Sequence, residues 1–341
     1  MNITDQIAEV NARRNWDVIL AEESGLTVEQ RRARLIGASD VAALMRLIPF
    51  KGARGPWDVY MDLYGLRRRA PMTLHMRKGL ILEPLLAQVY AETTGNRLFK
   101  AAETLAHSQL PVLTVHVDRL AQETLAPKPN LTIEMKMVGW RVKKHWDDGI
   151  PAYVLTQVMA QMSAWGLGQA HVPVDFDDEL SIFQAELDSE VETVILEAVE
   201  AFWRDHIVPM KPPEYDGSSA AGQYLLQKYP KAFEKVVQAP VEGIEAAKQY
   251  QALKTSLEAF ESRIGTTRQH LQELIGTDKG FQADGWKAQW YDVKGAARTD
   301  WKAVQGTLIE QGMIDRKTLA EVIEEHTKKS PDRRDFRFES T

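Results

Sequence analysis

The chain has 341 residues, which is enough for one large domain with extensions or for two domains. Its hydrophobic content of 44% and charged content of 26% are ordinary for a globular protein, and the absence of cysteine excludes disulfides, thiol nucleophiles and cysteine-bound zinc. The net charge of −6 neither indicates nor excludes a nucleic-acid binder, because a local basic patch is what meets phosphate.

Basic residues do cluster, at 31–34, 67–69 and 141–144, although solvated helix faces and loops are the simpler interpretation of each cluster. No apolar run approaches the length of a membrane span. Residues 1–20 carry charges throughout, without the pattern of a signal peptide. We therefore expect a cytoplasmic protein.

The first third of the chain predicts a run of helices. Residues 1–33 place apolar side chains on one stripe, and Ser39 is a suitable N-cap for the apolar run that follows it. A short helix in "GPWDVYMDLYG" is expected to end at Gly65. A longer helix is expected to end at Gly95, and we place Pro84 in its first turn, where a missing N–H costs nothing.

Two strands follow, and polar residues alternate along them. The segment "PVLTVHVD" ends at Asp118, and residues 131–138 alternate apolar side chains with polar ones that include Glu134 and Lys136. If the connecting hairpin is centred near Ala126, Asp118 falls opposite Glu134. An E-x-K pair on a strand is common, so a weak ion pair on a solvated face is the alternative interpretation.

The segment "GIPAYVLTQVMAQMSAWG" predicts a nearly apolar helix that begins at Pro151. Tyr153, Gln157 and Gln161 are spaced four residues apart, so they form one polar stripe on that helix. A buried glutamine is usually satisfied by backbone groups. Two glutamines in line with a tyrosine indicate instead that this face looks into a polar site.

The rest of the chain divides near Gly217. Before it, "AHVPVDF" predicts a strand, and residues 178–206 predict a long helix. After it, residues 242–276 predict one or two amphipathic helices with coiled-coil-like spacing. A hairpin turning at "DG" and a charged helical tail complete the chain. We therefore predict two domains, residues 1–216 and 217–341.

These elements can assemble one polar site. Glu83 would lie near a helix start, Asp118 at a strand end, and Glu134 with Lys136 on the facing strand. Two carboxylates opposite each other in a sheet repel unless a cation lies between them. Oxygen ligands without a cysteine or histidine cluster suit Mg²⁺ or Mn²⁺ rather than zinc. Such a metal activates water for phosphodiester hydrolysis, and Lys136 can orient or deprotonate that water and stabilise the transition state.

Several short motifs occur together in one order, and as a set they resemble a known family. They are "RLIGASDVAALM", "PFKGARGPWDVYMDLYG", "GLILEP", "HVDRL", "IEMK", "GIPAYVLTQVMAQM" and "FWRDHIVPMKPPEYDG". The chain resembles the YqaJ-like viral recombinases over roughly residues 28–216. These are phage lambda-type exonucleases of the PD-(D/E)XK nuclease superfamily. The resemblance implies an α+β (α/β) fold, a mixed central β-sheet flanked by helices, here with a mostly helical C-terminal extension.

The resemblance also implies roles for individual residues. Glu83, Asp118, Glu134 and Lys136 match the family's metal site and catalytic lysine, and the Met135 carbonyl is a further expected ligand. Two Mg²⁺ ions are usual for the family, with Mn²⁺ as a substitute, although these residues do not distinguish one ion from two.

Other positions match the family's contacts with DNA. Gln157 is expected to orient the site or the DNA, and Gln161 and Tyr153 lie on the same stripe and are expected to face the DNA. Arg32 and Ser39 resemble the pocket that holds the phosphate at a DNA end, a task that suits a helix start.

Three departures from the family pattern stand out. A tryptophan that often precedes the arginine of the phosphate pocket is missing, and the "PFK…PWD" stretch carries an insertion. Arg119 stands where many relatives have glycine. These differences concern the handling of the DNA end more than the chemistry.

The leading hypothesis is a Mg²⁺-dependent, double-strand-specific 5′→3′ exonuclease that leaves 3′ single strands for recombination. The resemblance implies a toroidal trimer, double-stranded DNA ends as substrate and a single-strand annealing protein as partner. If a phage or prophage encodes the chain, its location is the host cytoplasm. One alternative is a related nuclease that prefers single strands or cuts internally. Another is an inactive scaffold or DNA-end-binding protein.

Overall fold

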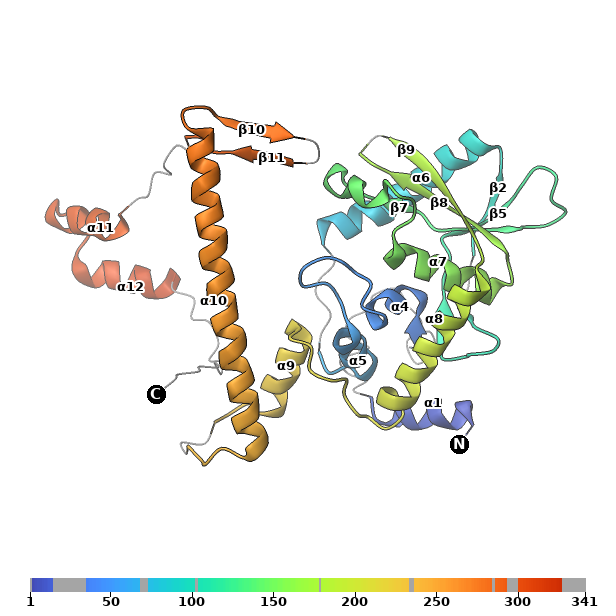
Figure 1. Cartoon of the computed structure of the whole chain (residues 1–341), viewed down its shortest axis with the longest axis horizontal. Helices are drawn as coiled ribbons and strands as arrows, with labels where there is room; N and C mark the ends of the chain where they lie inside the picture. Colours follow the sequence, from blue (N-terminus) through green and yellow to red (C-terminus); the bar gives the residue numbers. More distant parts are fainter. Residues whose placement is uncertain are drawn as a thin grey trace. The chain divides into compact units, whose positions relative to one another are not determined.

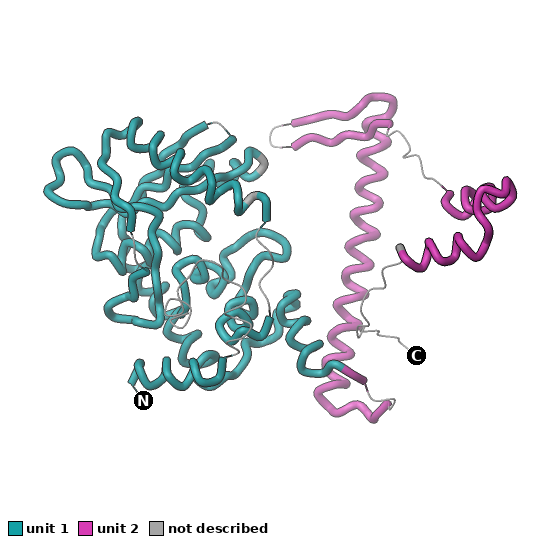
Figure 2. Tube along the Cα trace, turned by 180° about the vertical axis from the view of Figure 1, so that it is seen from behind, with its two compact units in different colours: residues 1–230 teal, residues 231–341 magenta. Residues whose placement is uncertain are grey.

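The computed structural model describes residues 2–14, 35–67, 73–101, 104–177, 179–232, 236–283, 286–292 and 300–326. The chain divides into two compact units, residues 1–230 and 231–341 (Figure 2). Helix α9 (Ser219–Lys228) packs on α5 and belongs to the first unit. The predicted domain boundary after residue 216 stays a prediction.

The first unit is built on a mixed sheet. Its strand order is β2-β5-β6-β8-β7, with β9 paired to the other side of β8. Strands β6 and β7 both run parallel to β8, whereas β5 pairs antiparallel with β6 and β9 antiparallel with β8. The strands are β2 (Arg97–Phe99), β5 (Arg119–Gln122), β6 (Leu131–Ile133), β7 (Lys136–Met137), β8 (Gln169–Asp175) and β9 (Leu180–Glu186).

The predicted strand over residues 131–138 is one strand with a two-residue gap. Ile133 pairs with His171, and Lys136 pairs with Val174, so both halves keep the same register on β8. The Glu134 amide still donates to the His171 carbonyl at 3.2 Å. The gap is therefore a local departure at Glu134 and Met135, and the strand does not slip.

The strand predicted in "PVLTVHVD" is confirmed over three residues, but residues 116–118 lie outside it and precede the strand that pairs with β6. β4 (Leu113–Val115) lies in a smaller sheet, between β1 (Ile36–Gly37) and β3 (Leu105–Ala106). The chain then enters the larger sheet at β5. Leu113 and Val115 are buried against the helical core, and alternation alone does not show which sheet a strand joins. Asp118 lies between β4 and β5, where the chain passes from the smaller sheet to the larger one.

Helices cover both faces of the larger sheet (Figure 1). One face carries α6, whose Leu86, Ala87 and Tyr90 pack against β5 and β6. The other face carries α7, together with α4 and α8. The helices of this unit are α1 (Ile3–Ala12), α4 (Ala38–Leu44), α5 (Pro56–Tyr64), α6 (Leu74–Thr94), α7 (Ala152–Trp165), α8 (Ser189–Phe202) and α9. A 3-10 helix (Trp140–Trp146) follows β7, and a π-helical turn (Trp203–Ile207) follows α8.

Glycines end three of these helices in the left-handed conformation, as their positions predicted for two of them. Gly65 follows α5 with φ of 63°, Gly95 follows α6 with φ of 72°, and Gly166 follows α7 with φ of 61°. Glycine has no Cβ to oppose positive φ, so it ends a helix at little cost. Pro151 is the N-cap of α7, as predicted.

Two helix starts differ from the prediction. Helix α6 begins at Leu74, where the Thr73 hydroxyl accepts the Met76 amide at 3.2 Å, so Pro84 lies inside the helix and not in its first turn. The helix continues through Pro84 despite the one backbone hydrogen bond that proline removes. Gly37 is the N-cap of α4, where the Asp40 carboxylate accepts its amide, so Ser39 lies in the first turn.

The predicted long helix over residues 178–206 was wrong in its first part. Residues 180–186 form β9, which pairs along its whole length with β8. Leu180 and Ile182 pack on the core next to α6, and this burial outweighs any helical preference of the segment. Helix α8 begins only at Ser189, after the Asp188 carboxylate accepts the amides of the first turn.

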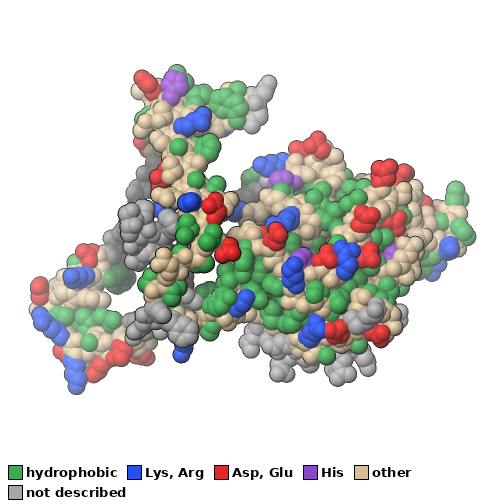
Figure 3. Space-filling view, turned by 60° about the horizontal axis from the view of Figure 1, so that its bottom comes forward, with side chains coloured by type: hydrophobic (Ala, Val, Ile, Leu, Met, Phe, Trp, Pro, Cys, Tyr) green, Lys and Arg blue, Asp and Glu red, His purple; other side chains and the backbone are tan. Residues whose placement is uncertain are grey.

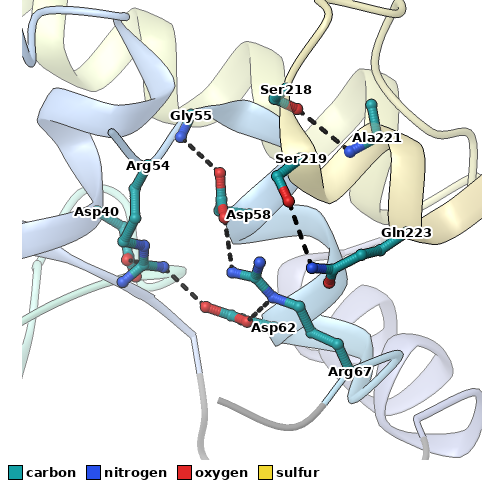
Figure 4. A network of polar contacts seen from close by, with 10 residues as sticks. All are labelled: Asp40, Arg54, Gly55, Asp58, Asp62, Arg67, Ser218, Ser219, Ala221 and Gln223. Carbon is teal, nitrogen blue, oxygen red and sulfur yellow. Dashed lines mark hydrogen bonds and ion pairs between the residues drawn. The ribbon is translucent and has the colours of Figure 1, made fainter. Parts of the chain in front are cut away.

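A partly buried ion-pair network ties the segment before α5 to that helix (Figure 4). Arg54 binds Asp40 and Asp62, each at 2.9 Å. Arg67 binds Asp58 at 2.8 Å and Asp62 at 2.9 Å. Asp62 is almost fully buried and accepts from both arginines, so it is the centre of the network.

The second unit is described separately. α10 (Val241–Ile275) is one uninterrupted helix, and β10 (Gly280–Ala283) pairs antiparallel with β11 (Trp286–Gln289). Ala283 pairs with Trp286, so the predicted hairpin is confirmed; its turn residues 284–285 lie outside the described residues. α11 (Trp301–Glu310) and α12 (Arg316–His326) follow. No helix in the described parts of the chain is long and apolar enough to cross a membrane.

Candidate active site

The β5–β6 ladder brings Asp118 and Glu134 together. Arg119 pairs with Ile133, so one step further along the ladder Asp118 lies opposite Glu134. The pairing is centred on Ala126, and this confirms the predicted register. The Met135 amide donates to Asp118 Oδ2 at 2.7 Å, because the gap between β6 and β7 releases this amide from the sheet.

Glu134 is buried, and both of its carboxylate oxygens accept hydrogen bonds. Lys136 Nζ lies 2.6 Å from Oε1, and Gln157 Nε2 donates to the same oxygen at 2.7 Å. Gln161 Nε2 donates to Oε2 at 2.7 Å and also to the His116 carbonyl at 2.7 Å. The predicted glutamine stripe on α7 therefore faces the polar side of β6 and β7.

Asp118 lies in a setting that opposes its negative charge. Burial is the main cause, and nearby Glu134 adds to it, so the pKa of Asp118 rises from 3.8 to about 7. The Met135 hydrogen bond and the Lys136 charge act in the opposite direction but do not cancel the rise. The site as it stands is short of positive charge.

Lys136 stays a cation in spite of its surroundings. Burial alone would lower the pKa of Lys136, but the charge and hydrogen bond of Glu134, with Asp118, raise it above its ordinary value. Nζ also donates to Gln157 Oε1 at 3.2 Å. A lysine with a raised pKa suits stabilisation of negative charge better than removal of a proton.

Tyr153 stands at the outer end of the stripe. Its ring packs edge-on against Phe50, with centroids 5.6 Å apart, and its side chain is half-buried. Burial raises the pKa of Tyr153, and the charge of Lys136 partly offsets that rise. The tyrosine is therefore electrostatically coupled to the lysine, and it remains a neutral hydroxyl at physiological pH.

Glu83 comes from the middle of α6 and is held by an arginine. Arg119 donates to Glu83 Oε1 at 2.8 Å, and the same guanidinium nitrogen donates to the Asp118 carbonyl. A cavity of about 370 Å³ opens beside these groups. It is lined by Met76, Gly79, Leu80, Glu83, Asp118, Glu134, Met135 and Met137.

The donor set of this cavity fits a divalent cation in its chemistry. Glu83, Asp118 and Glu134 line one cavity together with Met135, and carboxylate oxygens are donors of the kind that Mg²⁺ and Mn²⁺ prefer. Their side chains do not converge as they lie: among the described residues, no three acidic or histidine side chains are close enough to hold a metal. Glu83 is engaged by Arg119 and Glu134 by Lys136, so binding a cation requires these contacts to rearrange.

The predicted phosphate pocket is described only in part. Ser39 is exposed in the first turn of α4, whereas Arg32 lies outside the described residues. The Met135 amide contacts Asp118. The role of the Met135 carbonyl as a metal ligand stays a prediction. Acidic and basic side chains are interspersed over the face of the first unit in Figure 3, between broad hydrophobic areas.

Sequence reasoning missed several residues that shape the site. Arg119 was noted only as a departure from the family, yet it holds Glu83. Met76, Gly79 and Leu80 line the cavity on the same face of α6 as Glu83. Their spacing from Glu83 predicts that they share its helix face, but only if the helix is taken to begin as early as Leu74.

Comparison with known proteins agrees with the family resemblance that the motifs indicate. Residues 28–167 match the family model of the YqaJ-like viral recombinase domain. The uncharacterized protein YqaJ of Bacillus subtilis (strain 168) is 23% identical over 288 residues, which cover 81% of this chain and 86% of that protein.

Solved structures of two exonucleases are also similar. An alkaline exonuclease (LHK-Exo) from Laribacter hongkongensis is 20% identical, covering 59% of this chain and 97% of that chain, with a TM-score of 0.44. A phage related exonuclease from Haemophilus somnus 129PT is 16% identical, covering 52% of this chain and 96% of that chain, with a TM-score of 0.38. Residues 28–167 of the first unit are therefore similar to the YqaJ-like viral recombinase domain, in agreement with the resemblance of its motifs.

Proposed function

We propose that the chain is a metal-dependent deoxyribonuclease that digests linear double-stranded DNA from its ends. One observation carries this proposal: a YqaJ-like domain places Asp118, Glu134 and a cationic Lys136 together beside one cavity. The names of the similar exonucleases agree with it. The direction is 5′→3′, and the products carry 3′ single-strand tails for phage-type recombination.

Each residue has a role in hydrolysis of the phosphodiester bond. Glu83, Asp118, Glu134 and the Met135 carbonyl would hold Mg²⁺, with Mn²⁺ as a substitute and two ions as the expected number. The metal, when bound, supplies an activated water and polarises the phosphate. Lys136 stabilises the negative charge that develops on the phosphoryl oxygens. Gln157 and Gln161 fix the Glu134 carboxylate, so its position does not depend on Lys136 alone.

The DNA end has its own predicted contacts. Arg32 and Ser39 would bind the 5′-phosphate, and Tyr153 would face the DNA beside Lys136. The recombination role implies a single-strand annealing protein as partner and a trimer that encloses the duplex. These assignments follow from the family and stand as proposals.

A digestion time course tests the function. Linear duplex labelled at the 5′ or the 3′ end is incubated with Mg²⁺, and circular duplex and single strands are incubated in parallel. We expect early release of the 5′ label, late release of the 3′ label, an intact circle and no activity in EDTA. Cutting of the circle, or faster digestion of single strands, would overturn the exonuclease assignment in favour of a related nuclease.

A further inference from the structure

Helix α10 carries a regular heptad stripe, and most of its large apolar side chains are exposed. Coiled-coil core positions alternate three and four residues apart through more than three heptads, which gives a period of 3.5 residues. Such a sustained period is typical of a helix that pairs with another long helix along its length. The positions are Tyr250, Leu253, Leu257, Phe260, Ile264, Thr267, Leu271 and Leu274.

The apolar residues of this stripe are exposed in the structure. Leu253 is 64% exposed, Leu257 56%, Phe260 59% and Ile264 58%. A hollow of about 510 Å³ runs along the C-terminal half of the helix, lined by Phe260, Arg263, Ile264, Thr267, Arg268 and Leu271. Large apolar side chains in line on one face favour burial against a partner.

The sequence of α10 is complementary to itself when two copies run antiparallel. With Leu257 against Phe260 of the second copy, Leu253 meets Ile264 and the two helices overlap almost completely. In each outer layer, a smaller residue of one helix then lies opposite a larger residue of the other helix. These layers are Gly243 with Leu274, Ala246 with Leu271, and Tyr250 with Thr267.

Charges beside the stripe favour the same arrangement. In this register Lys254 lies beside Glu261 of the second copy, and the two-fold symmetry makes that attractive pair twice. A parallel pair in register would instead place Arg263 against Arg268 and would gain no attractive pair at the flanking positions. Like charges at such positions destabilise a coiled coil, so the antiparallel orientation is preferred.

We propose that α10 is a dimerisation element, which binds α10 of a second copy of this chain as an antiparallel two-stranded coiled coil. The pairing joins two chains through α10 of their second units and uses no residue that lines the cavity of the first unit. It does not depend on the proposed nuclease activity, and it holds for an inactive DNA-binding chain as well.

The molar mass of the full chain tests the pairing. Sedimentation equilibrium of the wild type is compared with the double variant L257E/I264E, which puts four like charges into the core of the dimer. We expect the double variant to have half the molar mass of the wild-type assembly. The matched control T255E/S262E adds the same charges to the opposite, exposed face and should keep the wild-type mass. An unchanged mass in L257E/I264E, or a monomeric wild type, would overturn the proposal.

Cysteine cross-linking tests the orientation, and the chain has no native cysteine to interfere. Leu253 and Ile264 share a layer only when the helices are antiparallel. Under oxidation, the double variant L253C/I264C should form covalent dimers, whereas L253C and I264C alone should not, because like positions lie about 16 Å apart at 1.5 Å per residue. Efficient cross-linking of either single variant would overturn the antiparallel arrangement.

Discussion

At the scale of single residues, two ion pairs of equal length, Lys136–Glu134 and Lys143–Glu179, differ in how deeply they are buried. Lys136 pairs with a buried carboxylate at 2.6 Å, beside a cavity. Lys143 makes an ion pair of the same length with Glu179, but both of those side chains are largely exposed. In the buried pair, the carboxylates around Lys136 raise the pKa of the lysine.

This contrast supplies a matched test of the catalytic lysine. Lys136→Ala should lower the cleavage rate by at least about 100-fold, because a cation at the reacting phosphate is lost. DNA binding should stay within about three-fold of the wild type, since the lysine acts in the transition state. Digestion of end-labelled duplex and binding by fluorescence anisotropy measure the two quantities. Lys143→Ala is the control, and full activity of Lys136→Ala would contradict the mechanism.

Asp118 gives a prediction about stability and pH. Its pKa is 3.8 when unfolded and about 7 when folded, so rising pH ionises the unfolded chain first and the native state loses stability between these values. Asp118→Asn removes that loss. In EDTA, the stability gain of Asp118→Asn over the wild type should grow by roughly 2.5 kcal/mol from pH 5 to pH 8. The growth falls over the two pH units up to the folded pKa, at about 1.4 kcal/mol per unit. Urea denaturation at both pH values measures it, and a gain that does not change with pH would count against the assignment.

Arg119 competes with a metal for Glu83. It donates to Glu83 at 2.8 Å, so a cation must displace a guanidinium before the carboxylate can bind it. Arg119→Gln should therefore lower the Mg²⁺ concentration for half-maximal cleavage several-fold, and Mg²⁺ titration of the digestion rate measures this. Arg97→Gln, on the neighbouring strand β2, is the control. A higher Mg²⁺ requirement in Arg119→Gln would show that the arginine assists the site.

At the scale of elements, the ion-pair network around α5 holds a loop to a helix. Asp62 accepts from Arg54 and Arg67 while almost fully buried (Figure 4). Removing Asp62 leaves Arg54 with only Asp40 and Arg67 with only Asp58, so both guanidinium groups lose part of their charge compensation. The segment before α5 therefore depends on this aspartate more than on any exposed pair.

Asp62→Ala should lower the free energy of unfolding by roughly 2–4 kcal/mol. Asp205→Ala, which breaks an exposed pair with Arg204, should leave it nearly unchanged. Urea denaturation of both variants at neutral pH measures the difference. Equal effects of the two substitutions would mean that the network contributes no more than surface pairs do.

The same scale shows what the sequence could predict. Glycine at a helix end has one clear structural use, so Gly65 and Gly95 were placed correctly. The β5–β6 register also followed from the hairpin and the alternation around it. Pro84 misled because proline is common in a first turn but is also tolerated inside a helix. The helical prediction for residues 180–186 failed because pairing with β8 decided their conformation.

The candidate site was predictable in part for a physical reason. Glu134, Lys136, Gln157 and Gln161 lie at regular spacing on one strand and one helix, so local periodicity brought them together. The Arg119–Glu83 contact joins a strand to a distant helix, and no local pattern reports such a contact.

At the scale of the whole molecule, the chain combines a sheet-based unit with a second unit dominated by one helix. Most hydrophobic burial lies in the first unit, in clusters on the two faces of its larger sheet. The 35-residue α10 has a single buried residue, Ile275, among its described side chains. Such a helix gains most of its stability from packing with a partner.

The pairing of β6 and β7 with β8 also bears on the order of events during synthesis. The acidic and basic groups of the cavity all precede residue 162, yet the Glu134 amide is held by the carbonyl of His171. Contacts between such distant segments form late in folding, after the chain that links them has closed into a loop. A ribosome-bound chain that ends before β8 therefore lacks the support for Glu134. We expect the cavity to become competent only when most of the first unit has left the ribosome.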